Sequence, residues 1–221
     1  MAETDADVKK YIDEKFDLII KAKTIEDLLK IENSSKLKKH RTNSEVYPRI
    51  DFNISRSEIE ELKVQGIINA DSTINHTRLK DISDPLARLF LLILWKNSDF
   101  QKIKHVNDGI LNTPPASGVE DTALVFRQLG RYISGRNEEP IIDQHVVRAY
   151  AISLQKSIHI ATQREMGLLT LDEAELIEKY KKWLFSSNFT SELRSCDGYT
   201  YYIDRILMAL GRYAKKKKVK K

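Results

Sequence analysis

The sequence predicts an all-α protein, a compact multi-helix bundle with at most a short β element near residues 45–75. Only 8 Gly and 5 Pro occur in 221 residues, a scarcity that suits helices better than a turn-rich β fold. Apolar residues recur at helical spacing in stretches joined by short connections, as in a compact bundle. With 41% hydrophobic and 31% charged residues, the chain can bury a core and remain soluble.

Residues 1–80 form a predicted N-terminal helical region. Its first helix covers about 5–22, and a second covers 25–31 behind the cap Thr24, with Asp27 placed as in a capping box. Residues 33–53 are polar and basic, so they form either a solvated link or a phosphate-contacting loop.

The end of this region contains one further predicted helix. It begins at Ser55 or Ser57 and is ended by Gly66. The pattern over residues 67–78 then allows a short strand or an extended loop.

Residues 81–214 form the predicted helical core, which begins with a strong start signal, Asp84 as N-cap and Pro85 at the first helical position. The apolar run at 89–95 is far shorter than the roughly 20 residues that span a bilayer, which indicates a buried core helix. We also expect Trp95, Trp183 and Tyr132 to be core residues. The remaining predicted helices cover 99–111, 117–132 behind a capping box, 143–160, 171–185 and 199–213.

The charge is concentrated at the C-terminus. The net charge is +5 with a pI near 9.1, and residues 215–221 contribute six lysines, so the body is near neutral. We expect 215–221 to be a disordered Lys-rich tail. It is either merely solvated or a nonspecific phosphate contact through Lys215, Lys216, Lys217 and Lys218.

Several function classes are disfavoured by the residues present. The single cysteine, Cys196, rules out an intrachain disulfide and a four-cysteine iron–sulfur cluster. The five histidines are scattered without cysteine partners, and neither a P-loop nor a dinucleotide fingerprint occurs. We therefore expect no metal and no cofactor. The acidic, apolar-poor start predicts no signal peptide, no membrane association and an intracellular location: cytoplasm or nucleoid, or nucleus in a eukaryote.

The segment that carries most information surrounds Asp143. Asp143 follows the apolar pair Ile141-Ile142 and stands at a predicted helix start. There the helix dipole and free N–H groups favour the ionised carboxylate. Such a group can stabilise a cation or orient a water molecule. Base excision needs both, because cleavage of an N-glycosidic bond builds positive charge on the sugar.

This segment, Ile141-Ile142-Asp143-Gln144-His145-Val146-Val147-Arg148, resembles the apolar-apolar-Asp-x-His-apolar-x-Arg segment of the helix-hairpin-helix DNA glycosylase superfamily, which includes endonuclease III-like enzymes. Gly118-Val119 followed by Thr122-Ala123 is similar to the family's hairpin, and the likeness spans about residues 84–160. The resemblance implies DNA as partner, Asp143 as the catalytic carboxylate and His145 and Arg148 as supporting neighbours. It also implies DNA contacts by Gly118, Val119 and Thr122.

The departures from the family pattern indicate a diverged branch. Glu120 and Asp121 replace the hairpin's second glycine and the residue after it, and two carboxylates there would repel a phosphate. Asp121 falls at or near the place of the lysine that bifunctional members use for Schiff-base chemistry. Two hypotheses follow. One is a monofunctional, water-displacing DNA glycosylase without lyase activity, acting on an unidentified modified or damaged base. The other is a non-catalytic nucleic-acid- or partner-binding helical protein, in which Asp143 only caps its helix.

Overall fold

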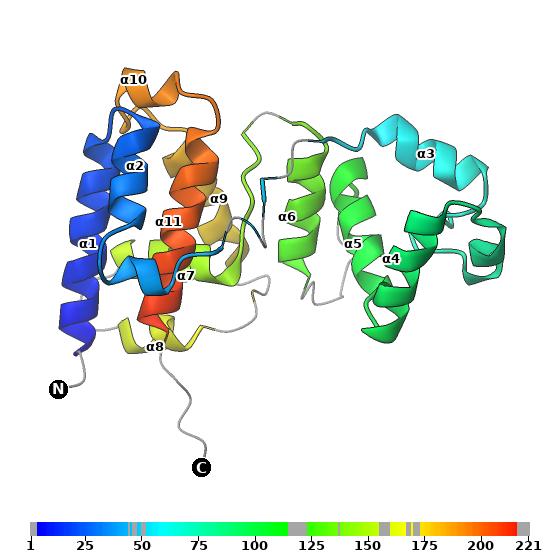
Figure 1. The fold of residues 1–221 in the computed structure, drawn as a ribbon, viewed down its shortest axis with the longest axis horizontal. Coiled ribbons are helices and arrows are strands. Elements are labelled where there is room, and N and C mark those ends of the chain that lie inside the picture. The colour runs from blue at the N-terminus through cyan, green and yellow to red at the C-terminus, as the bar shows by residue number, and fades with distance from the viewer. Residues whose placement is uncertain are drawn as a thin grey trace, which may run out of the picture. The chain divides into compact units, whose positions relative to one another are not determined.

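The computed structural model describes residues 4–43, 45, 48–49, 52–114, 123–136, 138–154, 160–166, 169 and 173–215 (Figure 1). Helices account for well over half of these residues. Within these ranges the only β pairing is an isolated antiparallel bridge between Ile68 and Ile74. The predicted all-α class is confirmed, and the bridge falls inside the region where a short β element was expected.

The chain divides into two compact units. Unit 1 comprises Met1–Ile50 together with Pro140–Lys221, and unit 2 comprises Asp51–Glu139. This division differs from the predicted boundary near residue 80. The reason is tertiary: the first two helices pack against helices from the C-terminal part of the chain, so both ends of the sequence build one core.

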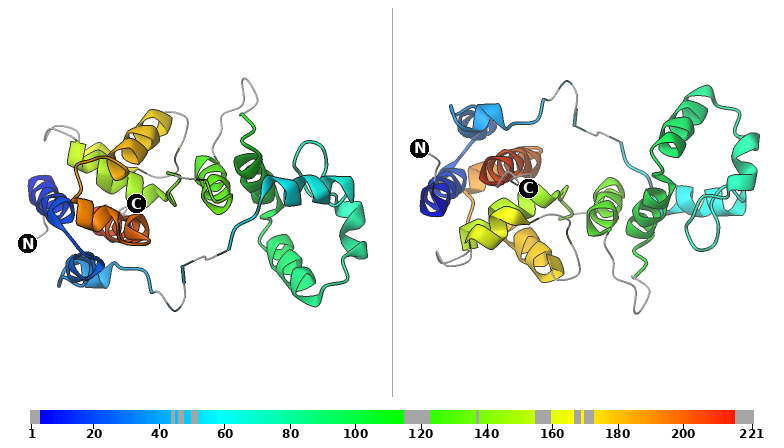
Figure 2. Two further views of the ribbon diagram at one scale, coloured as in Figure 1. Left: turned by 90° about the horizontal axis from the view of Figure 1, so that it is seen from above. Right: turned by 90° about the horizontal axis from the view of Figure 1, so that it is seen from below.

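Unit 1 contains, in chain order, α1 (Asp5–Lys21), α2 (Ile25–Glu32), the 3-10 helix η1 (Leu37–Lys39), α7 (Gln144–Leu154), α8 (Ile160–Glu165), α9 (Ala174–Leu184), α10 (Ser191–Arg194) and α11 (Tyr199–Ala214). Helix α11 is the central element and packs against both α7 and α2 (Figure 2). Its buried residues include Ile203, Ile206, Leu207 and Leu210. Trp183 of α9 is partly buried, with its ring centroid 5.2 Å from that of Phe16 and 5.0 Å from that of Phe189.

A glycine sets the crossing of α7 and α11. A Cβ atom at Gly211 would lie 1.9 Å from the carbonyl oxygen of His145, which is well inside van der Waals contact. The two backbones therefore approach as closely as they do only because position 211 has no side chain. This crossing places the last turns of α11 directly beside the first turn of α7.

Unit 2 contains α3 (Arg56–Val64), the 3-10 helix η2 (His76–Asp81), α4 (Pro85–Lys96), α5 (Phe100–Leu111) and α6 (Leu124–Ile133). Its core is formed by Ile59, Ile68, Ile110, Leu111 and Ile133. Helices α5 and α6 also cross at glycines: a Cβ at Gly109 would lie 2.1 Å from the Arg127 carbonyl oxygen, and one at Gly130 would lie 2.1 Å from that of Val106. Tyr132 is partly buried on α6.

Three of the predicted helix starts in the first half of the chain are confirmed by their caps. Thr24 and Asp27 form a capping box at α2, and Ser55 caps α3, which Gly66 follows with φ of +72°. The Asp84 side chain accepts a hydrogen bond from the Ala87 N–H at 2.7 Å, with Pro85 at the first helical position. These signals are local, which is why the sequence alone reveals them.

The prediction that residues 89–95 form a buried core helix is wrong. Helix α4 forms as expected, but none of its residues is buried, and Trp95, expected in the core, is 65% exposed. A continuous apolar run indicates that a helix can be buried, whereas actual burial requires neighbours, and unit 2 does not cover this helix. No helix in the described ranges has the length and apolarity needed to cross a membrane.

Candidate functional site

Asp143 occupies the N-cap position of α7. The His145 N–H donates to Asp143 Oδ1 at 2.6 Å, and the Val147 N–H donates to the Asp143 carbonyl oxygen at 3.1 Å. The preceding residue, Ile142, is buried and fixes the approach of the chain. The Asp143 side chain itself is partly exposed, so a carboxylate is presented at the positive end of a helix dipole.

Arg148, one turn further along α7, is fully buried. Its guanidinium donates to the carbonyl oxygen of Gly211 at 3.1 Å and to that of Met166, and it also contacts His145 Nδ1. The Nε atom has no hydrogen-bond partner among the described residues. Arg148 therefore links α7 to α11 and to the end of α8, and it supports the helix that carries Asp143.

His145 is held neutral by its surroundings. Burial, together with the positive charges of Arg148, Arg212 and Lys215, lowers the pKa of its imidazole to about 4, while the negative charge of Asp143 opposes them. A guanidinium only donates hydrogen bonds, so His145 Nδ1 must accept from Arg148 and the ring proton lies on Nε2. His145 is thus a neutral acceptor for Arg148 with a defined tautomer, and its supporting role at the site stays a prediction.

Arg212 contacts the loop after α2 and acts electrostatically on His145 at the start of α7. Its guanidinium donates to Thr42 Oγ1 at 3.2 Å and to the His40 carbonyl oxygen at 3.4 Å. Burial lowers the pKa of His40, and the positive charge of Arg212 lowers it further. The same charge also contributes to the lowered pKa of His145. Arg212 therefore lies within electrostatic reach of both segments, and a cationic neighbourhood extends from the 40–42 loop to the start of α7.

A polar pocket of about 410 Å³ continues this neighbourhood, lined by Lys38, Arg41, Thr42, Asn43, Glu45 and Arg205. Arg41 donates to Asn33 Oδ1 at 2.5 Å, and Arg205 pairs with the buried Glu32 at 2.9 Å. The pocket shares Thr42 with the Arg212 contacts. Two of its cations, Lys38 and Arg41, and the Thr42 hydroxyl suit an anionic group such as a phosphate, whereas Glu45 opposes one and Arg205 is paired with Glu32. Phosphate contact by this loop stays a prediction.

The buried carboxyl group of Asp204 on α11 contacts the segment that precedes Asp143. It accepts hydrogen bonds from the Tyr180 hydroxyl and from the Ile141 N–H, and burial raises its pKa well above the ordinary value. The Tyr180 hydroxyl is fully enclosed, and burial raises its pKa as well. These contacts fix the 140–142 segment, so the position of Asp143 is supported from α11 and from within α7.

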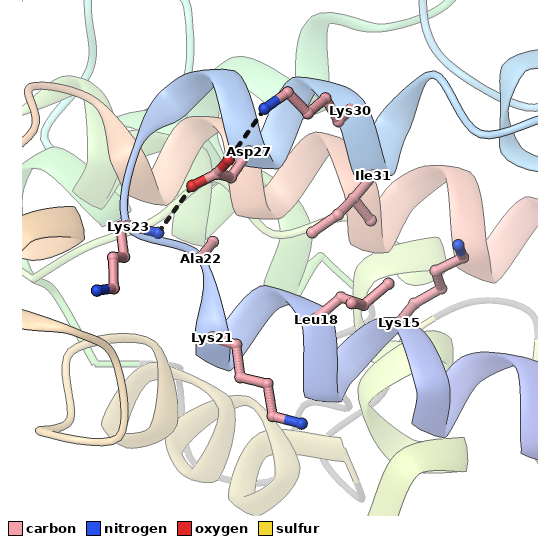
Figure 3. A pocket seen from close by; sticks show the side chains of 8 residues that line it. All are labelled: Lys15, Leu18, Lys21, Ala22, Lys23, Asp27, Lys30 and Ile31. Carbon is pink, nitrogen blue, oxygen red and sulfur yellow. Dashed lines mark hydrogen bonds and ion pairs between the residues drawn. The ribbon is translucent and has the colours of Figure 1, made fainter.

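A second groove lies between α1 and α2 (Figure 3). It encloses about 440 Å³ and has an apolar floor of Leu18, Ala22 and Ile31 bordered by Lys15, Lys21, Lys23, Lys30 and Asp27. Asp27 accepts from the Lys23 N–H at 3.2 Å and from Lys30 Nζ at 3.3 Å. The groove lies near the C-terminal end of α1. At the N-terminal end of α1, Asp5 pairs with Arg164, and Arg164 also contacts the end of α11. The groove is thus separate from the Asp143 region.

The predicted site residues fall into two groups. Asp143, His145 and Arg148 are brought together around the first turn of α7, and Lys215 follows α11 with its N–H bonded to the Gly211 carbonyl oxygen. The others lie outside the described residues: Gly118, Val119, Glu120, Asp121, Thr122, Lys216, Lys217 and Lys218.

Arg212 and Thr42 were not singled out from the sequence. No local pattern marks either residue, because each matters only through contacts across the fold. In the part of the chain that the structure describes, no cluster of His, Cys, Asp or Glu side chains could hold a metal ion.

A scan against protein-family models and searches of curated proteins and of solved structures found no match. Function is therefore inferred from the residues and the geometry of unit 1.

Proposed function

We propose that this protein is a monofunctional DNA N-glycosylase in which Asp143 is the catalytic carboxylate and the substrate is an unidentified modified or damaged base. The observation that supports the proposal is that two charged residues of the segment 141–148 differ in burial. Arg148 is fully buried and structural, whereas Asp143 stays partly exposed. Only Oδ1 of Asp143 is occupied, by the His145 N–H, and Oδ2 has no hydrogen-bond partner among the described residues.

The reaction follows from the chemistry of that carboxylate. The bond between C1′ of the sugar and the base nitrogen breaks, and its electron pair leaves with the base. Positive charge develops on the sugar, where the negative Asp143 stabilises it. The oxygen of a water molecule then bonds to C1′, and the proton that the water loses is balanced by protonation of the departing base nitrogen. The target base must first be flipped out of the duplex to reach such a group.

Binding of the DNA backbone is assigned to the cations around α7. Arg212 and Lys215 both act electrostatically on His145, and Lys38 and Arg41 line the adjoining polar pocket. Neutralisation of phosphates by such side chains releases counterions and gives salt-dependent affinity. The hairpin residues Gly118, Val119 and Thr122 and the lysines of the tail would add further contacts.

The test compares Asp143→Asn with a matched control, Asp17→Asn, on the exposed side of α1. Wild-type protein and both variants are incubated with duplexes that carry a panel of damaged and modified bases, and released base is quantified. We expect Asp143→Asn to lose about 100-fold or more in the rate of base release, because the charge that stabilises the sugar cation is removed. Asp17→Asn should match wild type.

The same substitution should hardly change the stability. Asparagine still caps a helix, so the free energy of unfolding should fall by less than about 1 kcal/mol. Equal base release by wild type and Asp143→Asn would exclude the proposed mechanism. The melting temperature, measured in parallel, ensures that a loss of activity is not a loss of fold.

A second candidate is a nucleic-acid- or partner-binding protein without catalysis. The observation that favours it is the hydrogen bond from the His145 N–H to Asp143 Oδ1, which is a complete N-cap by itself. The acidic pair Glu120 and Asp121 in the predicted hairpin points the same way. This candidate is favoured if duplex DNA binds with a salt-dependent affinity, no substrate releases a base, and Asp143→Asn binds as wild type does.

A further inference from the structure

Helix α4 of unit 2 presents apolar side chains to the outside over most of its circumference. Six large apolar residues are about half exposed or more: Leu86 58%, Leu89 53%, Phe90 54%, Leu92 58%, Ile93 49% and Trp95 65%. Scattered exposed apolar residues are normal, but six on one 12-residue helix are an unusual concentration, interrupted by the exposed Arg88 and Lys96. A largely apolar helix is ordinarily covered, and the described residues of unit 2 leave most of α4 uncovered.

The helical positions show which side of α4 is already used. Ala87, Leu91 and Leu94 are the partly buried residues of the helix, and their spacing places them on one face. Leu94 also lines the apolar pocket of unit 2, about 540 Å³, with Ile103 and Val106 of α5. Among its described residues, unit 2 therefore contacts one narrow face of α4 and leaves the rest of the circumference exposed.

The exposed surface of α4 approaches the size of a protein interface. At these exposures each of the six side chains presents on the order of 100 Å² of apolar area, so the patch offers on the order of 600 Å² per copy. One partner helix covers the face of Leu86, Leu89, Phe90 and Ile93, which is on the order of 400 Å² per copy, and contacts flanking that face would supply the rest of the roughly 1,200 Å² at which specific interfaces begin. A lipid surface fits less well, because interfacial helices are apolar on one side and strongly polar on the other.

The charges at the ends of α4 match those of a second copy in antiparallel orientation. Asp84 stands at the N-cap and Lys96 in the last turn, and both are exposed. When two α4 helices lie antiparallel, the Asp84 end of each faces the Lys96 end of the other, and their helix dipoles are also opposed favourably.

We propose that α4 is a self-association surface, through which two copies of this chain pair with their α4 helices antiparallel. A two-fold arrangement of this kind uses the same patch on both partners and closes after two copies. The proposal concerns unit 2, whereas Asp143 lies in unit 1. It is therefore independent of the proposed reaction.

The test is sedimentation equilibrium of the full chain over a range of concentrations, with Leu89→Asp as the disruptive variant and Val64→Asp as the matched control. Val64 is an 89% exposed apolar residue of the same unit, on α3 and outside the patch. We expect wild type and Val64→Asp to dimerise alike. Leu89→Asp should weaken dimerisation by about 100-fold or more, because a two-fold interface contains the substituted residue twice.

Circular dichroism and the melting temperature of each variant at monomeric concentration show whether the monomer still folds. The milder Leu89→Ser serves if Leu89→Asp does not fold, and it should weaken dimerisation in the same direction. A wild-type chain that stays monomeric at every concentration would overturn the proposal. So would a dimer that Leu89→Asp and Leu89→Ser leave intact, or one that Val64→Asp disrupts equally.

Discussion

At the scale of single residues, Arg148 illustrates how a buried charge can serve a helix rather than a ligand. Its side chain is fully enclosed, and it donates to carbonyl oxygens of two other segments. A lysine lacks the planar fork that reaches several acceptors at once. Arg148→Lys should therefore reduce the free energy of unfolding by roughly 2–4 kcal/mol.

Chemical denaturation of the Arg148→Lys variant measures this loss. The control is Arg194→Lys at the exposed end of α10, which should unfold within experimental error of wild type. A similar small effect for both substitutions would show that the contacts of Arg148 do not stabilise the fold.

His145 gives the protein a predicted pH dependence. Its pKa in the folded state, about 4, lies below the ordinary value of 6.5, so the unfolded chain binds the proton more readily between these two values. Stability should thus decrease as the pH falls from about 6.5 to about 4 and increase again on return. The lowered pKa of His40 acts in the same direction.

Thermal melts across that pH range test this prediction. His145→Gln should flatten the profile, whereas His76→Gln, at an exposed position of η2, should leave it unchanged. An unchanged slope in the His145 variant would assign the acid sensitivity to other groups.

At the scale of helices, the α7–α11 crossing depends on Gly211. Alanine favours a helix over glycine by about 1 kcal/mol, but its Cβ would lie 1.9 Å from the His145 carbonyl oxygen, which is backbone and cannot turn aside. We expect Gly211→Ala to destabilise the protein by roughly 2 kcal/mol or more, because overpacking outweighs the gain in helix propensity.

Urea denaturation measures the change in the free energy of unfolding. A Gly211→Ala variant that is more stable than wild type would contradict the prediction. Ala209→Gly on the same helix serves as a comparison, since it adds a glycine without adding contact. It should lose only about 1–2 kcal/mol, from helix propensity and a lost buried methyl group.

The helices that the sequence predicted best are those with a complete local signal. The capping pair Thr24 and Asp27, the cap Ser55 and the Asp84-Pro85 start each lie within a few residues of the turn they form. The short α10 and the 3-10 helices η1 and η2 were not predicted, because they are too short to show a hydrophobic period. The exposure of α4 could not be predicted either, since it depends on what the rest of the chain leaves uncovered.

The candidate site shows the same limit. Asp143, His145 and Arg148 lie within a stretch of six residues, so a single sequence motif contains all three. Arg212 reaches Thr42 across 170 residues of sequence, and no pattern along the chain records that contact. The catalytic candidate was thus visible in the sequence, whereas its cationic surroundings required the fold.

At the scale of the whole molecule, we predict that the Lys-rich segment 216–221 affects DNA binding without affecting stability. Residues 216–221 contain five lysines and one valine, which provide no apolar face to bury. Their deletion, with Lys215 retained, should leave the melting temperature almost unchanged. If the protein binds DNA as proposed, the deletion should also weaken nonspecific binding and reduce the slope of log K against log salt concentration by up to about four to five. Fluorescence anisotropy at several salt concentrations measures this, and unchanged binding would show that the tail makes no contact.

Unit 1 is discontinuous in the chain, and this has a consequence for biosynthesis. Helices α1 and α2 leave the ribosome first, but α7 and α11, on which they pack, follow only after all of unit 2 has been made. At ordinary translation rates that interval is on the order of ten seconds. During it α1 and α2 have each other but lack their partners α7 and α11, and early folding of Asp51–Glu139 would shorten the loop that must close.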